Sequence, residues 1–255
     1  MSLPSLAADP PSPFSVEYHE SIGSTNDRAR ELAAEGAADA VVVADRQTGG
    51  RGRRGRSWTG PQGGIYASVV LAPELPTDEV PMLTLAAGVA VARVAREAGT
   101  DAWIKWPNDV VVPVTGEEAP GTGDDPTPEG KLAGILTERV DDRAVVGIGV
   151  NANVDPADLP DRAVTLRDLV DDVDRGAFVA DVLVELDDLR SDPDGILPAW
   201  CDLARTLGQR VRVETPEGTV VGEAVGIDRP GRLVVETRDG RVQVSTGDCE
   251  HLRPA

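Results

Sequence analysis

GGRGRRGRSW (49–58) places four arginines among four glycines, directly after the apolar stretch AVVVAD (40–45). Glycines let a backbone approach a ligand closely, and guanidinium groups present paired donors to a phosphate or a carboxylate. We therefore interpret the stretch as an anion clamp at the end of a strand. The alternatives are a mobile surface loop and an RNA-binding Arg/Gly tract. The stretch is not a P-loop, because the pattern GxxxxGK[ST] is absent.

The overall charge argues against an RNA-binding tract. The formal net charge is -19, from 44 Asp and Glu against 25 Lys and Arg. Such a surface repels nucleic acid and anionic membranes, so we expect neither as a partner. Only two of those basic residues are lysines, Lys105 and Lys131. Acidity with Arg in place of Lys indicates a halophilic chain in a saline cytoplasm, where ~1 M salt shortens the Debye length to about 3 Å.

Each lysine opens a motif. KWPND (105–109) turns at its proline and leaves Asn108 and Asp109 at a strand end. An amide and a carboxylate there suit adenine or a metal ion, although an ordinary Pro-Asn-Asp turn has the same residues. KLAGIL (131–136) holds Gly134 in mid-strand, which often marks a ligand or a backbone that approaches closely.

A third motif, GIGVNAN (147–153), follows the same logic. It places Asn151 and Asn153 just past a strand of small residues. This position suits base recognition, and it equally suits a turn that ends the strand.

The hydrophobic pattern predicts an α+β chain. Expected helices are 24–36, 79–99, 176–190 and 195–206; expected strands are 40–45, 63–73, 102–106, 110–112, 131–140 and 144–154. From Gly208 onward, short strands at roughly ten-residue spacing with glycine turns are typical of a small barrel. We predict a mixed sheet flanked by helices over 15–206 and a small β-barrel over 207–255.

Two segments are expected to lie outside these domains. Residues 1–14 are Pro-rich and lack the basic and apolar regions of a signal peptide, so we predict a disordered tail. Residues 113–130 are rich in Pro, Gly and acids, and we predict a solvent-exposed excursion between two strands. No apolar run approaches the ~20 residues that span a membrane. Cys201 and Cys249 lie far apart and form no metal or redox motif, which indicates a reducing, cytoplasmic location.

The motifs taken in order are specific. The chain carries STN (24–26), Gln47, GRGRRGRSW (50–58), KWPND, KLAGIL and GIGVNAN, and then the small β-domain. This order resembles the biotin–protein ligases, also called biotin–[acetyl-CoA-carboxylase] ligases, over about residues 15–253. The family's repressor members carry an N-terminal winged helix-turn-helix. About 20 residues precede STN, so the chain resembles the ligase-only group.

The resemblance implies a fold and a reaction. The fold is a class II synthetase-like catalytic domain with a C-terminal SH3-like β-barrel. The family makes biotinyl-5′-AMP from biotin and MgATP, and then transfers biotin to one lysine of a biotin carboxyl carrier domain. ATP and Mg²⁺ act as co-substrate, and no tightly bound prosthetic group is implied. The sequence leaves a homodimer open.

The resemblance also implies the site residues. Catalytic residues are Lys131, Arg53 and Arg51. Biotin-binding positions are Ser24, Thr25, Asn26, Gln47, Arg51, Gly52, Arg53, Lys131 and Gly134. ATP-binding positions are Arg53, Arg56, Trp58, Asn108, Asp109, Asn151 and Arg253, and Asp109 also matches a position near the metal. Loop 49–57 would be disordered when empty and would close over the water-labile adenylate.

Two other functions stay open at this point. A lipoate- or octanoate-type ligase would keep the fold and the adenylation but activate another acid. A non-catalytic biotin sensor would bind without reacting. The polar set Ser24, Thr25 and Gln47 suits a ureido group and argues for biotin, and the charged groups argue for catalysis.

Overall fold

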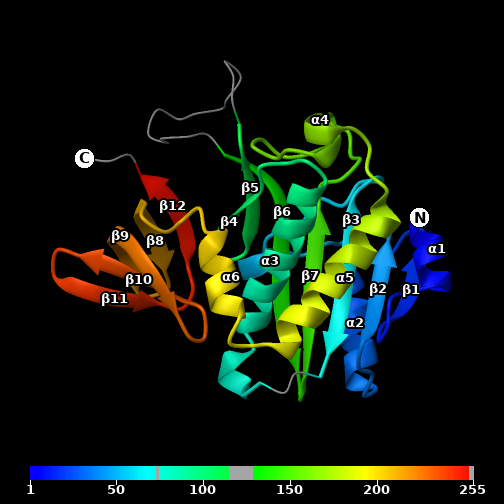
Figure 1. Ribbon diagram of the computed structural model, residues 1–255, viewed down its shortest axis with the longest axis horizontal. Coiled ribbons are helices and arrows are strands. Elements are labelled where there is room, and N and C mark those ends of the chain that lie inside the picture. The colour runs from blue at the N-terminus through cyan, green and yellow to red at the C-terminus, as the bar shows by residue number, and fades with distance from the viewer. Residues whose placement is uncertain (73–74, 115–128, 253–255) are drawn as a thin grey trace.

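A seven-stranded mixed sheet forms the centre of the larger domain (Figure 1). The computed structural model describes residues 1–72, 75–114 and 129–252. The strand order is β1-β2-β3-β7-β6-β5-β4, and only the β1–β2 pair is parallel. Its strands are β1 (Ser15–His19), β2 (Ala40–Ala44), β3 (Ile65–Leu71), β4 (Trp103–Lys105), β5 (Asp109–Pro113), β6 (Glu129–Val140) and β7 (Arg143–Val150). The predicted mixed sheet is confirmed.

Helices cover both faces of this sheet. Val41 and Val43 belong to the main core, whereas Val42 between them packs in a second, smaller core. Because side chains alternate across a strand, these two cores lie on opposite faces. Helix α2 (Thr25–Ala34) supplies Ala29 and Ala33 to the smaller core. The main core holds α3 (Met82–Glu97), α5 (Arg175–Ser191) and α6 (Ile196–Asp202), and Figure 1 shows α3 and α5 in front of the sheet.

Helix α3 is almost entirely buried. Its sequence, MLTLAAGVAVARVARE, is built from small and aliphatic residues, and one side of it packs on the sheet while the other packs against α5. Small side chains permit this close approach on several sides. The helix is therefore buried on more than one side. Short elements complete the domain: α4 (Leu166–Val170) and the 3₁₀ turns Arg53–Gly55, Thr77–Glu79 and Pro156–Asp158.

The N-terminal segment is helical, so the prediction of a disordered tail over 1–14 is wrong. Helix α1 (Leu3–Ala8) begins after Ser2, whose hydroxyl accepts a hydrogen bond from the Ser5 N–H. Leu3 and Leu6 share one face of the helix and are buried in the main core. The amino group of Met1 pairs with Asp174. The Pro-rich composition favoured a prediction of disorder. Burial of Leu3 and Leu6 in the core instead orders the segment.

The C-terminal domain is a five-stranded antiparallel sheet in the order β11-β10-β9-β8-β12. Its strands are β8 (Arg210–Thr215), β9 (Gly218–Asp228), β10 (Arg232–Thr237), β11 (Gly240–Val244) and β12 (Asp248–Leu252). In the described part of the chain β11 and β12 remain the two edges, so the expected closed barrel is not found. The predicted boundary near 206 falls between α6 and β8.

Buried polar contacts join the two domains beside KWPND. The indole N–H of Trp106 donates to the Gly231 carbonyl, and the Trp106 backbone N–H donates to the Thr206 hydroxyl. Most of the predicted excursion over 113–130 lies outside the described residues. Its last two residues, Glu129 and Gly130, instead begin β6, where Glu129 is buried and paired.

Candidate active site

One cavity of about 570 Å³ collects the motifs that the sequence singled out. It lies on the sheet face that α2 covers, beyond the N-terminal end of that helix. All the expected site residues within the described chain line it: Ser24, Thr25, Asn26, Gln47, Arg51, Gly52, Arg53, Arg56, Trp58, Asn108, Asp109, Lys131, Gly134 and Asn151. Arg253 lies outside the described residues.

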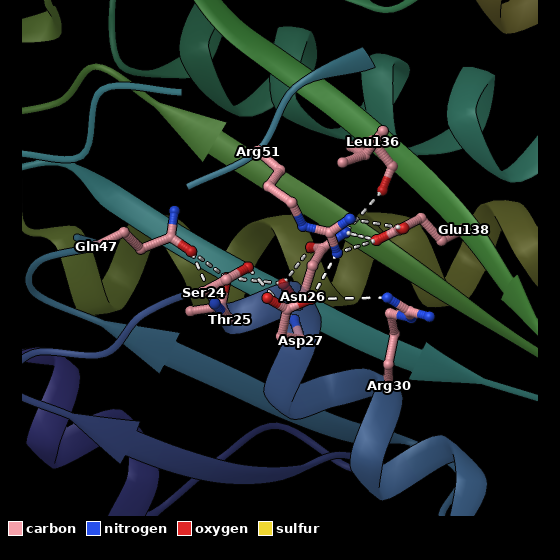
Figure 2. A network of polar contacts seen from close by, with 10 residues as sticks. Ser24, Thr25, Asn26, Asp27, Arg30, Gln47, Arg51, Leu136 and Glu138 are labelled. Carbon is pink, nitrogen blue, oxygen red and sulfur yellow. Dashed lines mark hydrogen bonds and ion pairs between the residues drawn. The ribbon is translucent and has the colours of Figure 1, made fainter. Parts of the chain in front are cut away.

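The first turn of α2 forms a polar end to the cavity (Figure 2). Ser24 caps the helix by accepting from the Asp27 N–H. The backbone N–H and the hydroxyl of Thr25 both donate to Gln47 Oε1, at 2.7 and 3.0 Å. These contacts hold the STN residues and Gln47 as one rigid polar group.

Ser68 supports this polar end from below, and the sequence analysis missed it. It is the one small polar residue in strand β3, which reads IYASVVL and is otherwise aliphatic apart from Tyr66, and its side chain is fully buried. Its hydroxyl lies 2.8 Å from Thr25 Oγ1 and 2.6 Å from Asn26 Oδ1. A hydroxyl inside an apolar strand was the available signal, because a buried polar group requires a partner.

Three glycines on β6 and β7 hollow out the floor of the cavity. Cβ atoms added at Gly134 and Gly149 would lie 2.9 and 2.7 Å from the ring of Trp58, and one added at Gly147 would lie 2.1 Å from Asn26 Oδ1. Gly134 and Gly149 are direct cross-strand partners. The close approach at Gly134 is thus a contact with an indole ring, and a larger residue at any of the three positions would displace Trp58 or Asn26.

The two lysine motifs meet at one ion pair. Lys131 Nζ lies 2.6 Å from Asp109 Oδ1 and 5.3 Å from the centre of the Trp58 ring. Asn108 ties the same turn to β6, because its side-chain amide donates to the Ile135 carbonyl. Asn151 in turn donates to the Lys131 carbonyl at 3.1 Å. Both asparagines fix backbone near the cavity.

Arg53 reaches across the cavity to the C-terminal domain. Its guanidinium donates to Asn108 Oδ1, Thr246 Oγ1 and the Gly247 carbonyl, at 3.1, 2.9 and 3.3 Å. These acceptors are all neutral. Burial lowers the pKa of Arg53, although nearby Asp248 and Asp109 oppose that effect. A partly buried guanidinium with neutral acceptors is suited to an incoming anion.

The other arginines of the loop pair with carboxylates. Arg51 lies 2.6 Å from Asp27 and 3.1 Å from Glu138. Arg54 and Arg56 both pair with Asp248 of β12. The loop therefore contacts α2 and β6 at one end and the C-terminal domain at the other.

Lys105 also lines the cavity, where it belongs to a largely buried charge cluster at the domain junction. Glu129, whose side chain is only 4% exposed, pairs with Lys105, Arg205 and His251 at 3.2, 3.1 and 3.2 Å. Burial alone raises the pKa of Glu129, but the hydrogen bond and charge of His251 and the charge of Lys105 outweigh it and lower the pKa to about 2. Both lysines line the cavity, with different partners: Lys131 pairs with Asp109, and Lys105 pairs with Glu129 at the domain junction.

The described residues offer no group of three or more His, Cys, Asp or Glu side chains that could hold a metal ion. No helix within the described ranges has the length and apolar character needed to cross a bilayer. Burial raises the pKa of the Cys249 thiol to about 12, so this thiol at the edge of the cavity is unreactive near neutral pH.

Comparison with known proteins agrees with this site. Residues 18–155 match the model of the biotin/lipoate A/B protein ligase family, and residues 206–252 match that of the biotin protein ligase C-terminal domain. The bifunctional ligase/repressor BirA of Bacillus subtilis is 35% identical over 91% of this chain and 73% of its own length. The biotin–[acetyl-CoA-carboxylase] ligase of Mycobacterium tuberculosis is 37% identical over 91% of this chain and 86% of its own.

A solved structure shares the whole architecture. The biotin protein ligase of Aquifex aeolicus, in complex with biotin and ATP, superposes with a TM-score of 0.75 and 29% identity, covering 94% of this chain and 99% of that one. The cavity, the order of its motifs and these matches lead to one conclusion: this chain belongs to the biotin/lipoate A/B protein ligase family, with a biotin protein ligase C-terminal domain.

Proposed function

We propose that this chain is a biotin–protein ligase, which activates biotin with MgATP to biotinyl-5′-AMP and transfers biotin to a lysine of a carrier domain. The observation that carries the proposal is the cavity of about 570 Å³, in which a polar end and a glycine floor lie next to Arg53 and Lys131. The similarity to ligases of two bacteria and to a ligase crystallised with biotin and ATP supports it.

Biotin would lie along the glycine floor. Its ureido group needs both donors and acceptors, and Ser24, Thr25, Asn26 and Gln47 supply them at the polar end. Its apolar tail would pass Gly134 toward Lys131. The indole N–H of Trp58 is buried without a hydrogen-bond partner among the described residues, which is consistent with an acceptor on a bound ligand.

The first step joins two anions. A carboxylate oxygen of biotin attacks the α-phosphorus of ATP, the new O–P bond forms, and the bond to pyrophosphate breaks. Arg53 and Lys131 would neutralise the carboxylate and the α-phosphate, and Arg56 would hold the departing phosphates. Neutral acceptors around Arg53 leave its charge available for this task.

The metal enters as part of the MgATP substrate. Magnesium in such sites is held by one or two carboxylates together with the phosphates, so the single carboxylate of Asp109 fits this demand. Trp58 and Asn151 would lie near adenine, and Asn108 near the phosphates. Arg253 would reach the nucleotide from the C-terminal domain.

The second step transfers biotin to the carrier. The neutral amine of the carrier lysine attacks the carbonyl carbon of biotinyl-5′-AMP, an amide forms, and AMP leaves. The partner is then a biotin carboxyl carrier domain. A reaction that consumes ATP supports a cytoplasmic location.

The experiment that tests the proposal compares acids. ATP–pyrophosphate exchange would be measured with biotin, lipoate and octanoate in separate reactions, with high salt. We expect exchange with biotin alone, and transfer to a purified carrier domain on its addition. If lipoate or octanoate supported exchange and biotin did not, that acid would be the substrate. Biotin binding without any exchange would show that the chain is a sensor. The match of residues 206–252 to a biotin protein ligase domain favours biotin.

A further inference from the structure

Glu138 of β6 holds two residues of the cavity with one carboxylate, as Figure 2 shows. Its Oε2 accepts from Asn26 Nδ2 at 2.9 Å and from Arg51 Nη2 at 3.1 Å, while its Oε1 accepts from Arg51 Nη1 at 3.3 Å. The pair with Arg51 is therefore two-pronged, a geometry that fixes the orientation of the guanidinium. Glu138 does not line the cavity itself.

The Asn26 amide is fully oriented by its neighbours. Its Nδ2 donates to Glu138 and its Oδ1 accepts from the Ser68 hydroxyl. The side chain of Asn26 is thus locked between two strands, against the face where Gly147 leaves room for it. Glu138 decides which way this amide points, because a carboxylate accepts and cannot donate.

Arg51 has its positive charge committed to carboxylates. Besides Glu138 it contacts Asp27 Oδ1 at 2.6 Å, so two anions face one guanidinium. Arg53, two residues further along, has only neutral hydrogen-bond acceptors. This division indicates that Arg53 meets the reacting anions and that Arg51 anchors the loop.

Backbone hydrogen bonds within the loop connect Arg51 to Trp58 on the floor of the cavity. Gly50 and Trp58 are joined by a backbone hydrogen bond of 2.9 Å, Gly52 and Arg56 by one of 2.7 Å, and Arg51 bridges to Ser57. The loop is therefore a small hairpin. Fixing the Arg51 side chain fixes both of its arms, including Trp58 on the glycine floor.

We propose that Glu138 is a positioning residue for biotin activation: it couples the polar end of the cavity, through Asn26, to the Arg-rich loop, through Arg51. The role in activation rests on the proposed function. Glu138 acts without touching biotin or ATP. It sets the amide of Asn26 for the head group of the acid, and it anchors the base of the hairpin through Arg51, which keeps Arg53 and Trp58 near the cavity.

The first test uses the ligand-free protein and needs no activity. Glu138→Gln keeps the shape of the side chain but removes the charge that pairs with Arg51. Trypsin should then cleave after Arg53, Arg54 or Arg56 about tenfold faster than in the unmodified chain, the loss expected for one charge-assisted contact. Glu185→Gln is the matched control, because Glu185 pairs with Arg93 at 2.9 Å and does not line the cavity. Its loop cleavage should not change.

The second test separates positioning from general stability. In steady-state adenylation, Glu138→Gln should raise the KM for biotin about tenfold and the KM for ATP by a smaller factor, because the loosened loop also carries Arg53 and Trp58, while the melting temperature stays equal to that of Glu185→Gln. Glu138→Asp, which keeps the charge, should recover most of the affinity for biotin and most of the loop protection. A purely structural role would change both KM values and the melting temperature together.

The outcomes are decisive in each direction. Loop cleavage unchanged in Glu138→Gln, or raised equally in Glu185→Gln, would overturn the anchor. If Glu138→Gln raised loop cleavage but left the KM for biotin unchanged, the proposed coupling of Glu138 to the polar end of the cavity through Asn26 would be wrong. If the unmodified chain forms no adenylate from biotin, the proposed function fails, and the cleavage assay still decides whether Glu138 holds the loop.

Discussion

Lys131 Nζ lies 2.6 Å from Asp109 Oδ1, so the first residue of KLAGIL pairs with the last residue of KWPND. Asp109 is also the cross-strand partner of Gly134, which brings the two motifs together over the floor of the cavity. In the ligand-free chain this pair satisfies both charges. MgATP would separate it, because the metal attracts Asp109 and the phosphates attract Lys131.

Replacing Lys131 by Ala should slow adenylate formation by 10²-fold or more, about 2.7 kcal/mol, because a charge contact to the transition state is lost. The fold should persist, since Lys131 is partly exposed and its backbone bonds remain. Single-turnover kinetics measures the effect, with circular dichroism as the control for folding. Unchanged single-turnover rates would remove Lys131 from the mechanism.

Biotin with MgATP should protect loop 49–57 from trypsin. The loop has four arginines and four glycines among residues 49–56, and a closed loop would shield the labile adenylate from water. Digestion with and without ligands, followed by mass spectrometry of the cuts after arginine, gives the comparison. Equal cleavage rates in both samples would show that this loop does not close over the ligand.

Gly147→Ala should weaken biotin binding. The new Cβ would lie 2.1 Å from Asn26 Oδ1, so the Asn26 amide would have to move away from Ser68. We expect the KM for biotin to rise roughly tenfold or more, in line with overpacking costs of about 1–3 kcal/mol. Gly226→Ala is the control, because nothing lies within 4 Å of its added Cβ. Equal KM values in the two variants would contradict the prediction.

Acid should remove the stability that Glu129 contributes. The pKa of Glu129 is lowered in the folded chain from 4.5 to about 2, so its contribution is complete above pH 4.5 and is lost as pH falls toward 2. Removing this carboxylate leaves the partly buried Lys105 and the buried His251 without their shared partner, at a cost of about 3 kcal/mol near neutral pH. Urea unfolding of Glu129→Gln against the unmodified chain measures this difference.

The difference in unfolding free energy between the two proteins should shrink progressively below pH 4.5. A gap that stays constant down to pH 2 would show that Glu129 keeps an ordinary pKa when folded. Because the cluster joins KWPND to the C-terminal domain, activity of the variant should also fall.

The chain should biotinylate itself very little when no carrier is present. Its amines are Lys105, Lys131 and the N-terminal amine, and each is ion-paired in the structure. Arginine stays protonated near neutral pH and is a poor acceptor for released adenylate. Intact-mass analysis after long incubation with biotin and MgATP is the measurement. Abundant multiple adducts would refute the prediction, whereas one adduct at the N-terminus is compatible with it.

Residues close together in the sequence determined much of this protein without help from the fold. The apolar strands expected at 40–45 and 144–154 and the turn within KWPND are local patterns, and the structure has β2, β7 and a turn between β4 and β5 at these places. The motifs GRGRRGRSW, KWPND and KLAGIL carry their chemistry within a few residues. Local patterns suffice there, because backbone periodicity and turn chemistry act over short range.

The tertiary structure decided which side chains meet. Asn26 and Glu138 lie 112 positions apart, and Arg53 and Thr246 lie 193 apart, yet each pair shares a hydrogen bond. Such contacts depend on strand register, since a slip of one residue would turn every side chain to the other face of the sheet. Leu3 and Leu6 order the N-terminal segment only because the core offers them a surface. The sequence therefore predicted which residues line the cavity. Only the tertiary structure, through long-range packing, placed Ser68, Glu138 and Glu129 in contact with them.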